Sequence, residues 1–74
     1  MEKLIVQSAR HDDRSVTLRD RRGRLHVARA TSALPPLGAD LWGYAPSLGF
    51  TTLFGATEGR VYRVIFEGVQ TWPE

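Results

Sequence analysis

The residues best suited to contact a charged ligand lie close together in the first half of the chain, between Arg10 and Ala30. This segment contains seven arginines against three aspartates, a local charge of +4, whereas the whole chain has a formal net charge of +2. Arginine suits phosphate oxygens because its guanidinium offers paired donors and stays charged at any working pH. A GC-rich genome would also favour nine arginines over a single lysine. The charge distribution therefore indicates phosphate binding without requiring it.

Catalytic and metal-binding side chains show no recognisable spacing. His11 and His26 are fifteen residues apart in a chain without cysteine, so a zinc site would need two carboxylates from elsewhere. Ser15, His26 and Asp40 would form a triad only if the fold brought them together, and any small protein offers similar combinations. No glycine-rich run precedes a helix. We therefore expect that the protein is not an enzyme and binds neither a metal nor a cofactor.

Alternating apolar and polar residues predict a β-hairpin in the arginine-rich segment. Four aliphatic residues are expected to share its core face: Val16, Leu18, Leu25 and Val27. This parity places Leu18 opposite Leu25. Arg19 and Arg24 then form the last pair, and residues 20–23 form a four-residue loop that ends in glycine. A three-residue loop would place Leu25 opposite Arg19 and interrupt the apolar face.

The outward face of this hairpin would then present the pairs Arg19/Arg24 and Thr17/His26, with two more arginines at the tip. Like charges directly opposite on a sheet cost roughly 0.2–1 kcal/mol, so folding alone would not select them. The candidate nucleic-acid-binding residues are Arg19, Arg21, Arg22, Arg24 and His26, with Trp42 and Tyr44 as groups that could stack on bases.

The remaining strands are expected over residues 4–10, 40–44, 50–54 and 60–70. A connector over residues 31–38 contains two consecutive prolines, which exclude a helix interior and a central strand. The loop over residues 56–59 should pair Gly55 with Arg60. On the last strand, three residues should share one face: Tyr62, Val64 and Phe66. Most of the seven aromatic side chains are expected in the core of so small a domain.

No stretch shows a 3.6-residue apolar period long enough for a three-turn helix. We expect one domain over residues 1–74, an all-β, small antiparallel barrel of five to six short strands with little or no helix, OB-like or SH3-like. Glycines at positions 43, 55 and 68 are candidate sites for a bend or a bulge. The order of hairpin, connector and glycine-led strand resembles an OB-fold in outline, which implies a ligand face on the second and third strands.

Two functions follow as alternatives. The first is a small binding module that contacts single-stranded nucleic acid through the arginine hairpin. The second is a protein-interaction or assembly module that uses the last strand, Val61 to Val69, if it lies at a sheet edge, together with Trp72. The longest apolar runs are too short to span a membrane, and the absence of cysteine fits a reducing compartment. We therefore expect a cytoplasmic protein without a membrane partner, and the sequence leaves its oligomeric state open.

Overall fold

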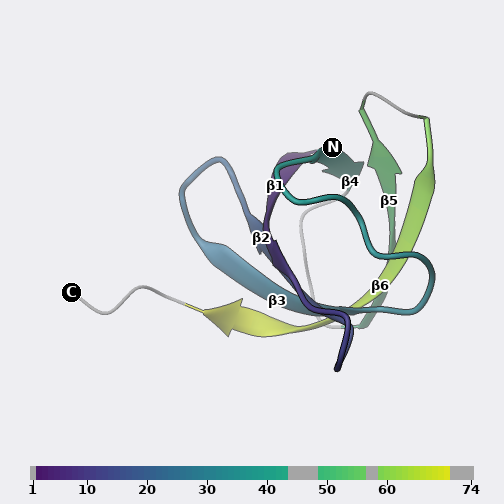
Figure 1. The fold of residues 1–74 in the computed structure, drawn as a ribbon. Helices are drawn as coiled ribbons and strands as arrows, with labels where there is room; N and C mark the ends of the chain where they lie inside the picture. Colours follow the sequence, from purple (N-terminus) through teal and green to yellow (C-terminus); the bar gives the residue numbers. More distant parts are fainter. Residues whose placement is uncertain (1, 44–48, 57–58, 71–74) are drawn as a thin grey trace.

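Six short runs of alternating apolar and polar residues form strands in the computed structural model, which describes residues 2–43, 49–56 and 59–70 (Figure 1). The strands are β1 (Glu2–Ala9), β2 (Ser15–Arg19), β3 (Leu25–Ala30), β4 (Asp40–Gly43), β5 (Gly49–Gly55) and β6 (Val61–Gln70). The described residues contain no helix, so none of them forms a helix able to cross a membrane. The predicted all-β barrel is confirmed.

The barrel is closed and antiparallel throughout. The strand order is β1-β2-β3-β6-β5-β4, and β4 pairs with β1 to complete the ring. Each half of the chain is thus a three-stranded meander, and the two halves join where β3 pairs with β6 and β1 with β4. The closure of all six strands differs from the five-stranded, partly open barrel of an OB-fold. Because the barrel is closed, every strand has a hydrogen-bonded neighbour on each side, and the sheet has no edge strand.

The core is formed by residues at alternate positions on all six strands. Its largest fully buried members are Tyr62, Leu4, Leu18, Leu41, Leu53, Val6, Val16 and Val64. The predicted inner face of β6 is confirmed, since Tyr62, Val64 and Phe66 are all buried. The expectation that most aromatic side chains build the core is wrong for the described residues. Trp42, Phe50 and Phe54 are exposed, because the inward positions of β4 and β5 belong to Leu41 and Leu53.

The connector between β3 and β4 crosses one end of the barrel (Figure 1). It begins beside β6, where the Thr31 amide donates to the Arg63 carbonyl at 2.9 Å. It ends beside β1, where the Gly38 amide donates to the Val6 carbonyl and the Val6 amide to the Ala39 carbonyl. Leu34 and Ala39 pack against the core on the way. A segment that can form neither helix nor central strand therefore covers the core at this end.

The predicted register of the β2–β3 hairpin is wrong. Arg19 lies opposite Leu25, and Leu18 lies opposite His26. The Asp20 amide donates to the Arg24 carbonyl at 3.0 Å, and the Gly23 amide donates to the Asp20 carbonyl at 3.1 Å. Gly23 has a φ of 85°. This is a three-residue loop, a type I turn followed by a left-handed glycine.

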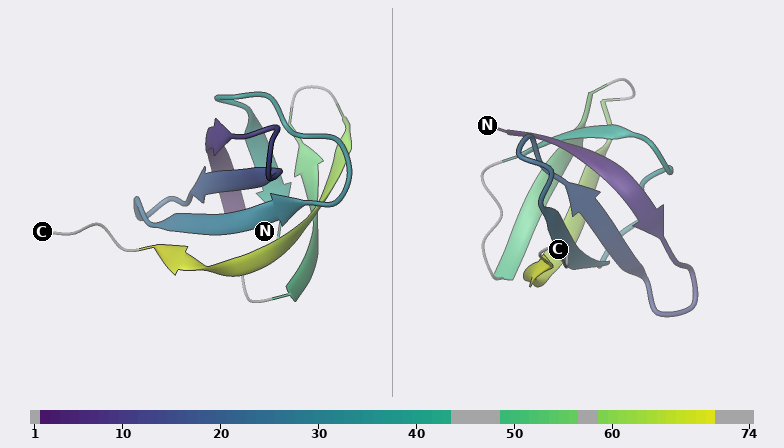
Figure 2. Two further views of the ribbon diagram at one scale, coloured as in Figure 1. Left: turned by 60° about the horizontal axis from the view of Figure 1, so that its bottom comes forward. Right: turned by 90° about the vertical axis from the view of Figure 1, so that its left-hand side faces the viewer.

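The three-residue loop reverses the two faces of β3. Its inward, buried residues are His26, Ala28 and Ala30. Leu25 and Val27, predicted to face the core, occupy the opposite side of the strand, where Leu25 is nevertheless buried and Val27 is half-buried. Midway along β3, a bulge in β6 places Gly68 opposite Val27 and Phe66 opposite Ala28. The hairpin and the end of β6 reach the same side of the barrel (Figure 2, left).

The second glycine-terminated loop follows the prediction. The Gly55 amide donates to the Arg60 carbonyl at 2.7 Å, which confirms the expected pair, and Gly59 has a φ of 69°. Gly68 lies at the β6 bulge, one of the three positions where a bend or bulge was predicted. Glycine thus takes the left-handed position of the turn before β6 and also lies at the bulge near the end of that strand.

The close approach of β4 to β5 predicts a specific sensitivity at Gly43. A methyl group there would overlap Cδ2 of the fully buried Leu53. We expect Gly43→Ala to lower the free energy of unfolding by roughly 1–3 kcal/mol, as overpacking of a core does. Chemical denaturation measures this. Gly68→Ala is the matched control, because nothing lies within 4 Å of its added methyl group. Equal stability of the two variants would contradict the packing described.

Candidate nucleic-acid interface

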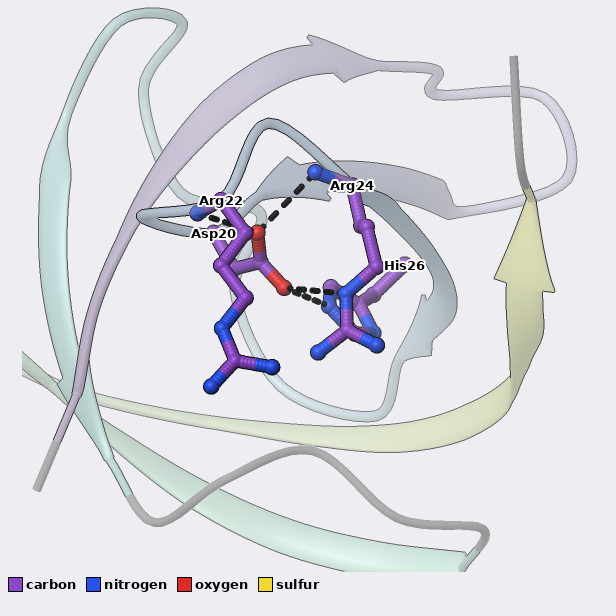
Figure 3. Close-up of polar contacts among 4 residues, drawn as sticks. All are labelled: Asp20, Arg22, Arg24 and His26. Carbon is purple, nitrogen blue, oxygen red and sulfur yellow. Dashed lines mark hydrogen bonds and ion pairs between the residues drawn. The ribbon is translucent and has the colours of Figure 1, made fainter.

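The carboxylate of Asp20 accepts the hydrogen bonds that hold the turn of the β2–β3 hairpin together (Figure 3). Its Oδ1 accepts hydrogen bonds from the backbone amides of Arg22 at 2.8 Å and Arg24 at 2.9 Å. Its Oδ2 accepts from Nε of Arg24 at 3.2 Å and lies 2.8 Å from Nε2 of His26. The side chain of Asp20 is only 2% exposed. Four polar contacts in and beside the turn therefore converge on one buried carboxylate.

His26 belongs to this buried cluster. Its ring meets Phe66 edge to face, with centroids 6.3 Å apart, and its side chain is 3% exposed. Because the ionised carboxylate of Asp20 can only accept, Nε2 of His26 must carry the proton between them. Nδ1 is buried and has no hydrogen-bond partner among the described residues. The prediction that His26 lies on the ligand surface is wrong, because its pair with Asp20 turns it into the barrel.

The charge on Asp20 is strongly favoured. Burial by itself would raise the pKa of this carboxyl, but hydrogen bonds from His26, Arg24 and Arg22 outweigh it and lower the pKa from 3.8 to about 2. The carboxylate is therefore ionised at every pH at which the protein is expected to work. It offsets part of the positive charge of the loop above it.

Three of the predicted arginines come together at the end of the barrel opposite the connector. Arg21, Arg22 and Arg24 line a hollow of about 590 Å³ with Glu2, the first described residue of β1. In the described part of the chain, the side chains of Arg21 and Arg22 have no hydrogen-bond or ion-pair partner. Arg24 uses only Nε on Asp20 and keeps its two terminal nitrogens for other contacts. Three guanidinium groups thus face a space large enough for a phosphate.

The other predicted residues lie outside this hollow. Arg19 is exposed on the outer side of β2, opposite Leu25 on β3 and Ile5 on β1, so the predicted Arg19/Arg24 pair does not form. Trp42 is 39% exposed on the outer side of β4, opposite Lys3. Tyr44 and Trp72 lie outside the described residues. The arginines therefore gather at the barrel end and not along the outer face of the hairpin.

No alternative chemistry assembles among the described residues. His26 takes its carboxylate from Asp20, so the considered set of Ser15, His26 and Asp40 does not form. No group of three or more histidine or acidic side chains in the described ranges could hold a metal ion. Sequence reasoning missed the central role of Asp20 and the presence of Glu2. The available signal was the spacing of Asp20, Gly23 and His26, which suits a three-residue turn followed by an inward histidine.

The low pKa of Asp20 predicts a specific loss of stability in acid. Ionised Asp20 stabilises the fold above its unfolded-state pKa of 3.8, and this contribution is lost as the pH falls towards the folded-state pKa of about 2. We expect Asp20→Asn to lower the free energy of unfolding by about 1–3 kcal/mol at neutral pH. The variant should also show a flatter pH dependence between about pH 4 and pH 2.

Urea denaturation across this pH range measures both effects. The control is Asp12→Asn, because the exposed Asp12 side chain forms a surface ion pair with Arg10 and accepts a hydrogen bond from the Asp13 amide, contacts that contribute little to stability. Identical pH profiles for the Asp20→Asn variant and the original chain would contradict the assigned role of the carboxylate.

Comparison of the chain with protein-family models, with curated proteins and with solved structures finds no match. The function must therefore be argued from the geometry and charge of the site itself.

Proposed function

We propose that this chain is a small non-enzymatic binding module that contacts nucleic-acid phosphates through Arg21, Arg22 and Arg24. The observation that supports the proposal most is the hollow that these three side chains line at one end of the barrel. Guanidinium groups bind phosphate oxygens with paired donors, and most contacts between proteins and nucleic acids go to phosphate and sugar. Arg19 adds a further positive charge on the neighbouring outer surface of β2.

The buried network prepares the hollow for an anion. Asp20 holds the backbone of the turn and Nε of Arg24 in place, so less conformational freedom is lost when Arg24 meets a ligand. Arg21 and Arg22 project from a turn whose shape is already fixed by Gly23 and Asp20. The carboxylate of Glu2, which also lines the hollow, would repel a second anion. Binding of this kind reads phosphate groups and not base sequence.

The alternative function, a protein-interaction or assembly module, has less support. Its premise was a last strand at a sheet edge, but β6 pairs with β5 over residues 61–66 and with β3 over residues 64–70. Residues 64–66 are paired on both sides, so a second chain could pair with them only if the barrel opened. Trp72, the other feature invoked, lies outside the described residues. A cytoplasmic location stays a prediction from the absence of cysteine.

The proposal predicts strongly salt-dependent binding. With three to five phosphate contacts, affinity for a labelled single-stranded oligonucleotide should fall roughly twenty- to hundredfold between 50 and 200 mM salt. Arg21→Gln combined with Arg22→Gln should weaken binding at low salt and reduce the slope of log affinity against log salt by about 1–2. Fluorescence anisotropy measures both quantities.

A control of equal charge separates the site from the net charge of the molecule. Arg10→Gln combined with Arg29→Gln removes two arginines that are already paired with Asp12 and Glu67. This control should retain most of the affinity. Equal losses in the two double variants would show that binding is nonspecific, and retention of full affinity without Arg21 and Arg22 would refute the proposed site.

A further inference from the structure

Three exposed aromatic side chains lie on the outer wall of the barrel, and we call them the aromatic face: Trp42, Phe50 and Phe54. They are 39%, 82% and 42% exposed. Trp42 lies directly opposite Phe54 on neighbouring strands. Phe50 and Phe54 are four residues apart on β5, so both point outward, about 13 Å apart along the strand. Exposed aromatic side chains do not pack in the core, and a contiguous exposed patch of them is typical of a binding surface.

Basic side chains are interleaved with the aromatic face. Lys3 lies opposite Trp42, and Arg63 lies opposite Thr52, midway between the two phenylalanines. The guanidinium of Arg63 has no partner in the described part of the chain, and Arg60 is exposed just before the same strand. The acidic residues of β4 and of the described part of β6 are Asp40 and Glu67, and Glu67 is already paired with Arg29. The charge of this wall complements a polyanion.

A small hollow in this wall is lined by both an aromatic side chain and a cationic one. It has a volume of about 280 Å³ and is lined by Phe50, Arg63 and three threonines among others. A ring face, a guanidinium and hydroxyl groups together suit a planar group with polar edges. A nucleobase has this chemistry.

The aromatic face continues directly from the arginine hollow. Glu2 lines the hollow, and Lys3, the next residue, points to the outside of β1 opposite Trp42. Phe54 lies one strand further, so it is about 10 Å from the line of β1 at ordinary strand spacing. A chain of nucleotides can therefore pass from the hollow over the rim of the barrel and onto the aromatic face.

We propose that the aromatic face stacks the unpaired bases of a single-stranded nucleic acid, an inference that rests on the proposed phosphate contacts of the arginine hollow. Bases in a duplex are already stacked on one another, so exposed rings on an outer wall select for single strands. A dry protein interface is a poorer fit, because it would bury Lys3 and Arg63 among apolar groups without carboxylate partners.

The test uses the full chain with Trp72→Phe, which leaves Trp42 as the only tryptophan. A short oligothymidylate should quench the fluorescence of Trp42, whereas an abasic oligonucleotide of the same length should bind more weakly without comparable quenching. Trp42→Leu or Phe54→Leu, measured by anisotropy, should weaken binding of the oligothymidylate about 5- to 150-fold and leave the salt dependence unchanged. Neither change should alter affinity for the abasic oligonucleotide. Phe54→Tyr, which keeps an aromatic ring, should bind the oligothymidylate as tightly as the chain with Phe54 does.

Leu37→Ala is the control for loss of exposed apolar surface, because Leu37 is 73% exposed on the connector and carries no aromatic ring, and it should change affinity less than twofold. Full affinity of the leucine variants for oligothymidylate, with normal binding of the abasic strand, would overturn base stacking and leave the phosphate contacts intact. Absence of binding to either oligonucleotide would instead refute the phosphate contacts. Self-association that Phe54→Asp abolishes, without effect on nucleic-acid binding, would also overturn stacking in favour of a protein contact.

Discussion

The buried contact between Asp20 and His26 determines which side of β3 faces the core. Only with His26 inward can Nε2 reach the carboxylate at 2.8 Å while both oxygens also receive the amides and guanidinium of the turn. The pair has a cost, because two polar side chains are desolvated and Nδ1 of His26 finds no partner in the part of the chain that the structure describes. Its effect is therefore on register more than on net stability. A shift of the β2–β3 register by one residue would expose His26 and leave the buried Asp20 without its hydrogen-bond partners.

The same register gives the barrel interior its size. The inward residues of β3 after His26 are Ala28 and Ala30, which lie opposite Phe66 and Val64 on β6. Small residues on one strand thus face large residues on the next, and Phe66 also packs against the ring of His26. Six strands enclose a narrow space, and alternation of small and large side chains is how such a space is filled. Leu25 and Val27 in place of the alanines would crowd Phe66 and Val64.

The sequence pattern was sufficient for the strands, the absence of a helix in the described residues, the Gly55–Arg60 turn and the inner face of β6, because each follows from local alternation or turn chemistry. It was insufficient for the hairpin register. Counting aliphatic residues favours Leu25 and Val27 inward, since an isolated histidine is normally expected outside. The contact that favours the other register is the one between His26 and the carboxylate of Asp20, six residues earlier in the chain. Likewise, Phe50 and Phe54 differ in no local signal from core aromatics, and only the inward position of Leu53 places them outside.

The reversed hairpin also relocates the positive charge. Asp20 and His26 are buried, and Arg24, which contacts Asp20, lies at the end of the barrel. There it lines the hollow together with Arg21 and Arg22 of the turn. An outward arginine ribbon would have offered one flat wall of the sheet to a ligand, as the OB-like outline implied. The observed arrangement instead places charge at the rim and aromatic rings on the wall beyond β1. In the function proposed above, the arginines would set affinity and its salt dependence, and the rings would distinguish exposed bases from a bare phosphate chain. Because the two sets of side chains lie on separate surfaces, each can be changed independently of the other.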